Sequence, residues 1–159
     1  MMTSRLERRF LARVIRPYGL AEIHMDYFLK ILVADRSLEF LDRMHSFLWD
    51  AGHEAEVASD ALECATLLEH FTPDVVVLDS DLLWGGSAGV LARLASSPQL
   101  AEVPVILMVQ EGRPCDPFVA QSRRIVARLY KPVHVHELQS AVERHAARVR
   151  ERSLLLSCV

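Results

Sequence analysis

The sequence predicts a doubly wound α/β fold, in which five parallel strands form one sheet with helices on both faces. From residue 30 onward, short apolar runs alternate with amphipathic stretches of helical spacing. The runs Val75–Leu78 and Val105–Val109 are continuously apolar, which is typical of parallel strands that are covered on both faces. The 159 residues fit one domain of ordinary size, with short segments left over at the ends.

Five strands are expected. The first, third and fourth are rich in Val, Ile and Leu, whereas the second and fifth are weaker because polar residues interrupt them. In chain order they are Leu29–Ala34, His53–Ala58, Val75–Leu78, Val105–Val109 and Ile125–Tyr130.

Amphipathic segments between and after the strands predict four clear helices. They are Ser37–Asp50, Asp60–His70, Ser87–Ser96 and Val135–Arg150. The first three begin at a Ser or Asp, which is the residue type expected at an N-cap. A further helix belongs between the fourth and fifth strands, and Pro114 and Pro117 predict an irregular start for it.

The composition is that of an ordinary globular protein, with 51% apolar residues, 25% charged residues and a formal charge of −3. This charge is too small to indicate a nucleic-acid or membrane surface, and no apolar run approaches the roughly 20 residues that span a bilayer. Three cysteines, Cys64, Cys115 and Cys158, lack CxxC spacing and are odd in number. This argues against a disulfide framework or a zinc site. We therefore expect a cytoplasmic protein that binds neither membranes nor nucleic acid directly.

Residues 1–28 form a basic leader, which is expected to be helical or disordered. Residues 1–29 carry a charge of +2, whereas the rest of the chain carries −5. Ser4–Glu7 has the form of a capping box, and apolar residues then repeat every four positions as far as Val14. The leader could be an arm that binds a partner or a surface, a solvated tail, or the result of a start codon upstream of Met25.

Charged side chains stand at the ends of three expected strands. Asp35 follows the first strand, Asp79 ends the third, and Lys131 follows the fifth. Because ligands bind at the carboxyl ends of the strands in open α/β sheets, we expect these three side chains to meet there. A carboxylate nucleophile, a second acid for a cation and an ammonium group suit a site that binds or accepts a phosphoryl group.

Four segments in this order, Ile31–Asp35, Pro73–Asp79, Val103–Val109 and Tyr130–Pro132, resemble the receiver domain of two-component response regulators. The resemblance covers about residues 29–148 and leaves residues 149–159 as a C-terminal tail. It implies a CheY-like, flavodoxin-like fold with the strand order 2-1-3-4-5. Each motif alone is weak, but four at matching intervals are a strong signal.

The resemblance also implies roles for individual residues. Asp79 stands at the position of the aspartate that accepts phosphate from a histidine kinase, and Asp35 matches the first of the paired acids that organise Mg²⁺. Lys131 matches the lysine that contacts the phosphoryl group, although a plain ion pair with a strand-end carboxylate remains an alternative. The resemblance suggests a cis peptide bond between Lys131 and Pro132.

Several positions depart from the family pattern, so the receiver is expected to be atypical or degenerate. Arg36 stands in place of the second acid, Val109 in place of the hydroxyl residue at the end of the fourth strand, and Arg128 in place of the aromatic switch residue. Leu83 occupies the position of an expected proline, and the loop at Trp84–Gly86 is two residues longer than usual. Coupling between the site and the surface should therefore be weaker.

The substitution at Arg36 should lower Mg²⁺ affinity. A guanidinium group has no lone pair to offer a metal, and a unit charge pair at 4 Å is worth roughly 4 kcal/mol at an effective dielectric constant of 20. The expected metal ligands are Asp35, Asp79 and Asp81, and the last of these could instead be a solvated loop residue. Arg36 and Lys131 are expected to flank Asp79 as built-in counter-charges.

Other kinds of site are disfavoured. His134 and His136 are two positions apart at the start of a helix, so their side chains diverge, and no third ligand stands beside them. The turn Asp35–Leu38 contains no glycine, which argues against a loop that cradles phosphate in a nucleotide-binding enzyme.

The sequence thus predicts a stand-alone receiver of a phosphorelay, which is not an enzyme and acts through protein contacts. Its expected partners are a histidine kinase or phosphotransfer protein and a downstream output protein, because only about ten residues follow the last helix. One alternative is a pseudo-receiver that binds partners independently of phosphorylation. A less favoured alternative is a nucleotide-binding α/β enzyme.

Overall fold

A computed structural model describes the backbone of residues 28–157 and the side chains of residues 28–146. The predicted leader therefore lies outside the described residues, apart from Phe28. The strands are β1 (Lys30–Ala34), β2 (Glu54–Ala58), β3 (Val75–Asp79), β4 (Val105–Val109) and β5 (Ile125–Tyr130). The helices are α2 (Leu38–Asp50), α3 (Ala61–His70), α4 (Gly86–Ser96), a short 3₁₀ helix η1 (Pro98–Leu100), α5 (Pro117–Ala120) and α6 (Val135–Ser157).

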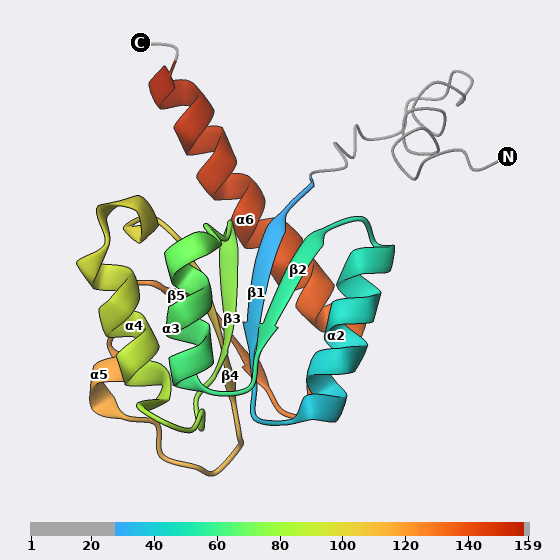
Figure 1. The fold of residues 1–159 in the computed structure, drawn as a ribbon, viewed down its shortest axis with the longest axis vertical. Coiled ribbons are helices and arrows are strands. Elements are labelled where there is room, and N and C mark those ends of the chain that lie inside the picture. Colours follow the sequence, from blue (N-terminus) through green and yellow to red (C-terminus); the bar gives the residue numbers. More distant parts are fainter. Residues whose placement is uncertain (1–27, 158–159) are drawn as a thin grey trace, which may run out of the picture.

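The five strands form one parallel sheet in the order β2-β1-β3-β4-β5 (Figure 1), which confirms the predicted fold class and strand order. In the register of the sheet, Ala34 pairs with Leu78 and Asp79 pairs with Met108. The strands therefore end together at the lower edge of the sheet in Figure 1, where the loops to the following helices begin. This edge carries Asp35, Asp79 and Lys131.

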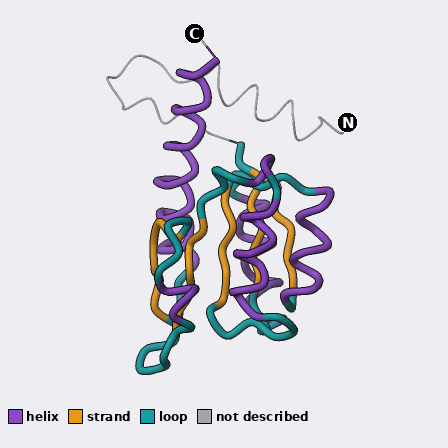
Figure 2. The backbone as a smooth tube through the Cα atoms, turned by 90° about the vertical axis from the view of Figure 1, so that its left-hand side faces the viewer, coloured by secondary structure: helices purple, strands orange, loops and turns teal. Residues whose placement is uncertain are grey.

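Helices cover both faces of the sheet (Figures 1 and 2). One apolar cluster joins alternate strand residues to α2 and α6, and the other joins the remaining strand residues to α3, α4 and α5. In the central strand β3, Val75 and Val77 belong to the first cluster, whereas Val76 and Leu78 belong to the second. Every residue of β3 is buried, which explains why the run Val75–Leu78 that precedes Asp79 is continuously apolar.

Two of the three predicted N-caps are confirmed. The side chain of Ser37 accepts a hydrogen bond from the backbone of Phe40, and that of Asp60 accepts one from the backbone of Glu63. The prediction for Ser87 is wrong, because α4 begins at Gly86 and its N-cap is Gly85, two residues before Ser87, with φ of 98°. The Ser87 hydroxyl instead donates to the carbonyl of Ser80 at 3.2 Å. A glycine suits this start because the loop enters the helix through a left-handed conformation.

The last helix is longer than predicted. It runs to Ser157 rather than Arg150, so the boundary expected at residue 148 falls inside α6 and most of the expected tail is helical. No glycine or proline follows Pro132 in the sequence, and good helix formers continue beyond residue 150. The second half of α6 extends past the end of the sheet opposite the strand-end loops (Figure 1).

The segment between β4 and β5 is irregular, as its prolines predict. Only Pro117–Ala120 is helical there, and the side chain of Asp116 caps this turn by accepting from Phe118 and Val119. A long loop, residues 110–116, is thus left at the carboxyl edge of the sheet. None of the helices in residues 28–157 combines the length and apolar character needed to cross a membrane.

Candidate functional site

Lys131 joins the two strand-end carboxylates, as the sequence predicts. Its Nζ lies 2.7 Å from Oδ2 of Asp35 and 3.0 Å from Oδ1 of Asp79. The aspartates are 2% and 1% exposed, so the ammonium is a counter-charge shared by two carboxylates that water can scarcely reach. The backbone N–H of Lys131 donates to the carbonyl of Val109 at 2.9 Å, and the Lys131–Pro132 peptide bond is cis, as the resemblance suggests.

Backbone amides orient both carboxylates. The N–H of Ser37 donates to Oδ1 of Asp35 at 2.8 Å, and the N–H of Asp81 donates to Oδ1 of Asp79 at 3.1 Å. Oδ2 of Asp79 is buried and has no hydrogen-bond partner in the part of the chain that the structure describes. A buried acceptor without a partner costs about 1–3 kcal/mol. This oxygen thus has free capacity to accept a hydrogen bond or to bind a ligand.

Asp81 is the centre of a second group of charges at the same edge. Its Oδ2 lies 2.6 Å from Nη1 of Arg113 and 3.9 Å from Nη2 of Arg36. The ion pair that Arg36 forms within residues 28–146 is with Asp81, whose backbone N–H donates to Asp79. That Arg36 flanks Asp79 as a counter-charge stays a prediction. Two guanidinium groups from neighbouring loops thus attract the partly exposed side chain of Asp81. Its predicted role as a metal ligand stays a prediction.

Arg113 joins this group of charges and was not among the residues singled out from the sequence. It lies in the loop between β4 and α5 and reaches a residue 32 positions earlier in the chain. The only available signal is that this loop follows a strand and so begins at the carboxyl edge of the sheet. Nothing in the local pattern of residues 110–116 distinguishes Arg113 from any other exposed arginine.

The two altered switch positions have ordinary structural environments. Val109 ends β4 and packs against the apolar cluster on the α3–α4–α5 side of the sheet. The guanidinium of Arg128 donates to the carbonyl of Ala120 at 2.7 Å, and so ties β5 to the end of α5. Neither side chain offers a hydroxyl group or an aromatic ring to the Asp79 site.

The residues predicted to hold Mg²⁺ do not fit a tight site for it. Lys131 contacts both Asp35 and Asp79, and Asp81 is paired with two arginines. Mg²⁺ takes oxygen ligands in a near-octahedral arrangement and is repelled by adjacent cations. Among the described residues, no group of three or more His, Cys, Asp or Glu side chains is arranged to hold a metal ion.

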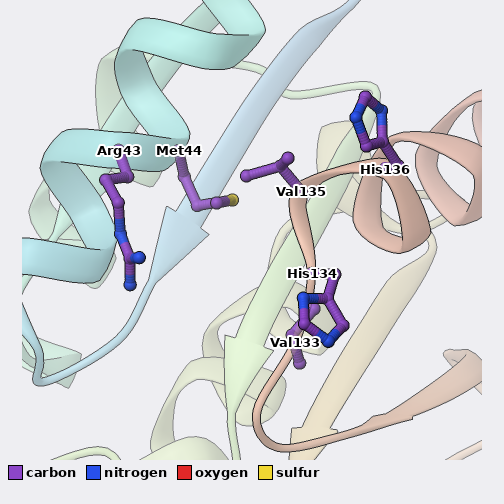
Figure 3. A pocket seen from close by; sticks show the side chains of 6 residues that line it. All are labelled: Arg43, Met44, Val133, His134, Val135 and His136. Atoms are coloured by element: carbon purple, nitrogen blue, oxygen red, sulfur yellow. The ribbon is translucent and has the colours of Figure 1, made fainter.

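A groove of about 450 Å³ lies between α2 and the start of α6 (Figure 3). Arg43 and Met44 line one side, and residues 133–136 line the other. The rings of His134 and His136 lie apart in Figure 3 rather than facing each other. His136 packs edge-on against Phe47, with 5.5 Å between ring centroids.

A parallel sheet in the order 2-1-3-4-5, with an Asp–Lys–Asp cluster at its carboxyl edge, defines a CheY-like receiver fold. The solved structures agree. The chain matches a CheY-like receiver domain from Methanospirillum hungatei with a TM-score of 0.68 at 19% identity, over 79% of this chain and 99% of that one. It matches NtrX from Brucella abortus with a TM-score of 0.70 at 24% identity, over 84% of this chain and 30% of that one.

A third similar structure is the receiver domain of the sensor histidine kinase PA1611 from Pseudomonas aeruginosa, which has a magnesium ion coordinated in its active-site cleft. The TM-score is 0.67 at 17% identity, over 76% of this chain and 99% of that one. No protein-family model matches the chain. Among curated proteins, "Probable transcriptional regulator ycf29" of Pyropia yezoensis is 24% identical over 127 residues. The match covers 79% of this chain, which spans 57% of that relative's length.

Proposed function

We propose that this chain is a receiver of a two-component phosphorelay, in which Asp79 accepts a phosphoryl group and the signal passes on by protein contacts rather than by catalytic turnover. One observation carries the proposal. The carboxylate of Asp79 is buried, Lys131 and a backbone amide hold one of its oxygens, and the other oxygen has no partner among the described atoms. A nucleophile needs this combination of fixed orientation and one free oxygen.

In the proposed transfer, Oδ2 of Asp79 attacks the phosphorus of a phosphohistidine on a histidine kinase or phosphotransfer protein. The phosphorus–nitrogen bond breaks, the imidazole keeps the electron pair and takes a proton, and Asp79 becomes an acyl phosphate. Lys131 remains beside the reacting group and offsets part of the added negative charge. Its contact with Asp35, at 2.7 Å, holds the ammonium beside Asp79 before transfer.

The proposed receiver is atypical in its metal and switch positions. Arg36 replaces an acid and pairs with Asp81, so Mg²⁺ would bind only weakly through Asp35 and Asp79. Val109 offers no hydroxyl group to a phosphoryl oxygen. We further propose that residues 29–148 form the receiver unit, preceded by the basic leader of residues 1–28, and that it acts as a stand-alone cytoplasmic receiver through a downstream output protein.

The direct test is incubation with a small phosphodonor such as acetyl phosphate, followed by intact-mass measurement. The wild-type protein should gain the mass of one phosphoryl group, and Asp79→Asn should gain none. Asp74→Asn is a matched control, because Asp74 precedes the same strand but accepts from the backbone of Lys30 at 2.7 Å. Equal labelling of wild type and Asp79→Asn would rule out Asp79 as the acceptor.

A second candidate function is a pseudo-receiver that binds a partner without phosphorylation. It is favoured by Arg36 and Val109, which remove a metal ligand and a phosphate contact together. In that case the wild-type protein gains no mass from any phosphodonor, and Asp79→Asn binds the partner as tightly as wild type does. Phosphoryl transfer to Asp79 would exclude this alternative.

A further inference from the structure

The charges at the carboxyl edge indicate a site that binds a phosphoryl group without a metal ion. We propose that Arg36 and Arg113 take the place of a divalent cation, and that they leave Asp81 for the phosphoryl oxygens when Asp79 is modified. This inference rests on the proposed function, since it concerns the same acceptor. It adds a role for Arg113 and a structural consequence of modification.

Three loops converge at Asp81. Arg36 follows β1, Asp81 follows β3 and Arg113 follows β4, and both guanidinium groups are directed at the same oxygen of Asp81, at 3.9 Å and 2.6 Å. The backbone N–H of Asp81 donates to Oδ1 of Asp79. The two arginines therefore contact Asp81, which is itself hydrogen-bonded to the proposed acceptor Asp79.

The charges of the site balance only before modification. Asp35, Asp79 and Asp81 supply three negative charges, and Lys131, Arg36 and Arg113 supply three positive charges. A phosphoryl group carries about two negative charges near neutral pH, so modification of Asp79 adds roughly one. A site with two paired acids can bind a divalent cation, which offsets the added charge. In this site Arg36 and Arg113 already lie beside Asp81 and offset that charge instead.

The arginines are suited to this exchange. Their side chains are 43% and 54% exposed, so they can move without disturbing the core. Exposed ion pairs contribute little to stability, so the arginines can break their ion pairs with Asp81 at a small cost in free energy. Guanidinium groups bind phosphoryl oxygens with two parallel hydrogen bonds, which are stronger than bonds to a neutral group.

The unpartnered Oδ2 of Asp79 is the independent observation that a ligand belongs here. The residue is 1% exposed, and this buried oxygen has no hydrogen bond within the described structure. Buried carboxylate oxygens are normally hydrogen-bonded. A phosphoryl group attached to this oxygen would contact the surrounding cations and so supply the interaction that the oxygen lacks.

The same exchange gives a conformational signal. When Arg113 leaves Asp81, the loop at residues 110–116 loses its ion pair with the loop after β3. Trp84 lies in that second loop, three residues after Asp81, and is 77% exposed. Its fluorescence should therefore report the change in the loops without an added label.

The test compares phosphorylation with excess EDTA and with Mg²⁺, using phosphoramidate as the donor and intact mass as the readout. Wild type should be modified at similar rates in both conditions. The double variant Arg36→Gln/Arg113→Gln should be modified at least tenfold more slowly in EDTA, and Arg113→Lys should be intermediate. Arg93→Gln is the matched control, because Arg93 is also an exposed, paired arginine, 3.6 Å from Glu69 on another surface.

The outcomes separate the two proposals. Modification of wild type with Mg²⁺ but not with EDTA would overturn the arginine inference and leave the proposed function standing. Equal rates for wild type and the double variant in EDTA would also overturn it. No modification of Asp79 in either condition would overturn the proposed function itself. Each single arginine variant is measured as well, so that a folding defect in the double variant does not decide the result.

Discussion

Nζ of Lys131 lies 3.0 Å from Oδ1 of Asp79, a carboxylate that is 1% exposed, although 52 positions separate the two residues in the sequence. The same ammonium lies 2.7 Å from Asp35. One partly exposed cation is therefore shared by two buried anions and offsets half of their charge. Folding must bring both carboxylates out of water, and Lys131 makes this possible.

The first prediction is that Lys131→Met lowers the free energy of unfolding by about 3 kcal/mol, because it leaves Asp35 and Asp79 buried without a counter-charge. Urea unfolding at neutral pH measures this. The double variant Lys131→Met/Asp79→Asn should recover part of the lost unfolding free energy, because one of the two uncompensated charges is then removed. An unchanged urea midpoint in Lys131→Met would show that the ammonium is not required to bury the carboxylates.

The second prediction concerns metal affinity. Arg36→Asp should strengthen binding of Mg²⁺ and of beryllofluoride, because it removes a repulsive cation and adds an oxygen ligand. Trp84 fluorescence is the readout for the titration. Adding Arg113→Gln should strengthen Mg²⁺ binding further, since it frees Asp81. Recovery of beryllofluoride binding should be partial, because Val109 still lacks a hydroxyl group.

Two outcomes would contradict that second prediction. Tight Mg²⁺ binding by the wild-type protein would mean that Arg36 does not weaken the site. A titration that Arg36→Asp leaves unchanged would mean that position 36 is not directed toward the metal position. Arg43→Asp serves as the control, because it adds the same charge in the groove between α2 and α6 rather than at Asp81.

The third prediction uses a pair of glycines in and before α4. Gly85 has φ of 98°, so Gly85→Ala should destabilise the fold by about 1–2 kcal/mol even though the new Cβ would meet only Ala61, at 3.8 Å. Gly89 lies inside the helix, and a Cβ added there would meet nothing within 4 Å beyond the backbone of the helix itself. Gly89→Ala should therefore stabilise the fold by about 0.5–1 kcal/mol. Thermal unfolding of both variants should shift in opposite directions.

The fourth prediction concerns alkaline pH. Burial raises the pKa of the Cys64 thiol from its usual value of 9.0 to about 12, and the nearby charges of Glu63 and Asp60 act in the same direction. Between pH 9 and pH 12 the unfolded chain releases this proton while the folded chain keeps it. The contribution of the neutral thiol to stability is therefore complete below pH 9 and is lost as the pH rises through this window.

Cys64→Ala removes this titration. The unfolding free energy of wild type should fall more steeply between pH 9 and pH 12 than that of Cys64→Ala, by roughly 4 kcal/mol across the window. Groups that titrate in both proteins cancel in the comparison. Parallel pH profiles for the two proteins would show that the thiol titrates normally in the folded state.

Much of the site could be predicted because it depends on strand order along the chain. Buried parallel strands have a continuous apolar pattern, and their carboxyl ends lie at one edge of the sheet. Once three strands are recognised, the residues that end or follow them, Asp35, Asp79 and Lys131, must lie near each other. The N-caps Ser37 and Asp60 were equally predictable, since a cap depends on residues three positions apart.

The surrounding charges could not be predicted in this way. The sequence places Arg36 next to Asp35, but the guanidinium pairs with Asp81 on another loop. Arg113 reaches Asp81 because the loop of residues 110–116 begins at the same edge of the sheet as the loop after β3. Exposed side chains have many partners within reach, and the small energies of surface ion pairs leave the choice to loop conformation.

By itself, then, the sequence determined the doubly wound sheet and the positions of the Asp–Lys–Asp cluster, because apolar periodicity and strand order are properties of the chain. Only the tertiary structure decided that Asp81 is held by two arginines and that Oδ2 of Asp79 is left without a partner in the described residues. These features depend on how loops far apart in the sequence approach one another, and neither periodicity nor local propensity contains that information.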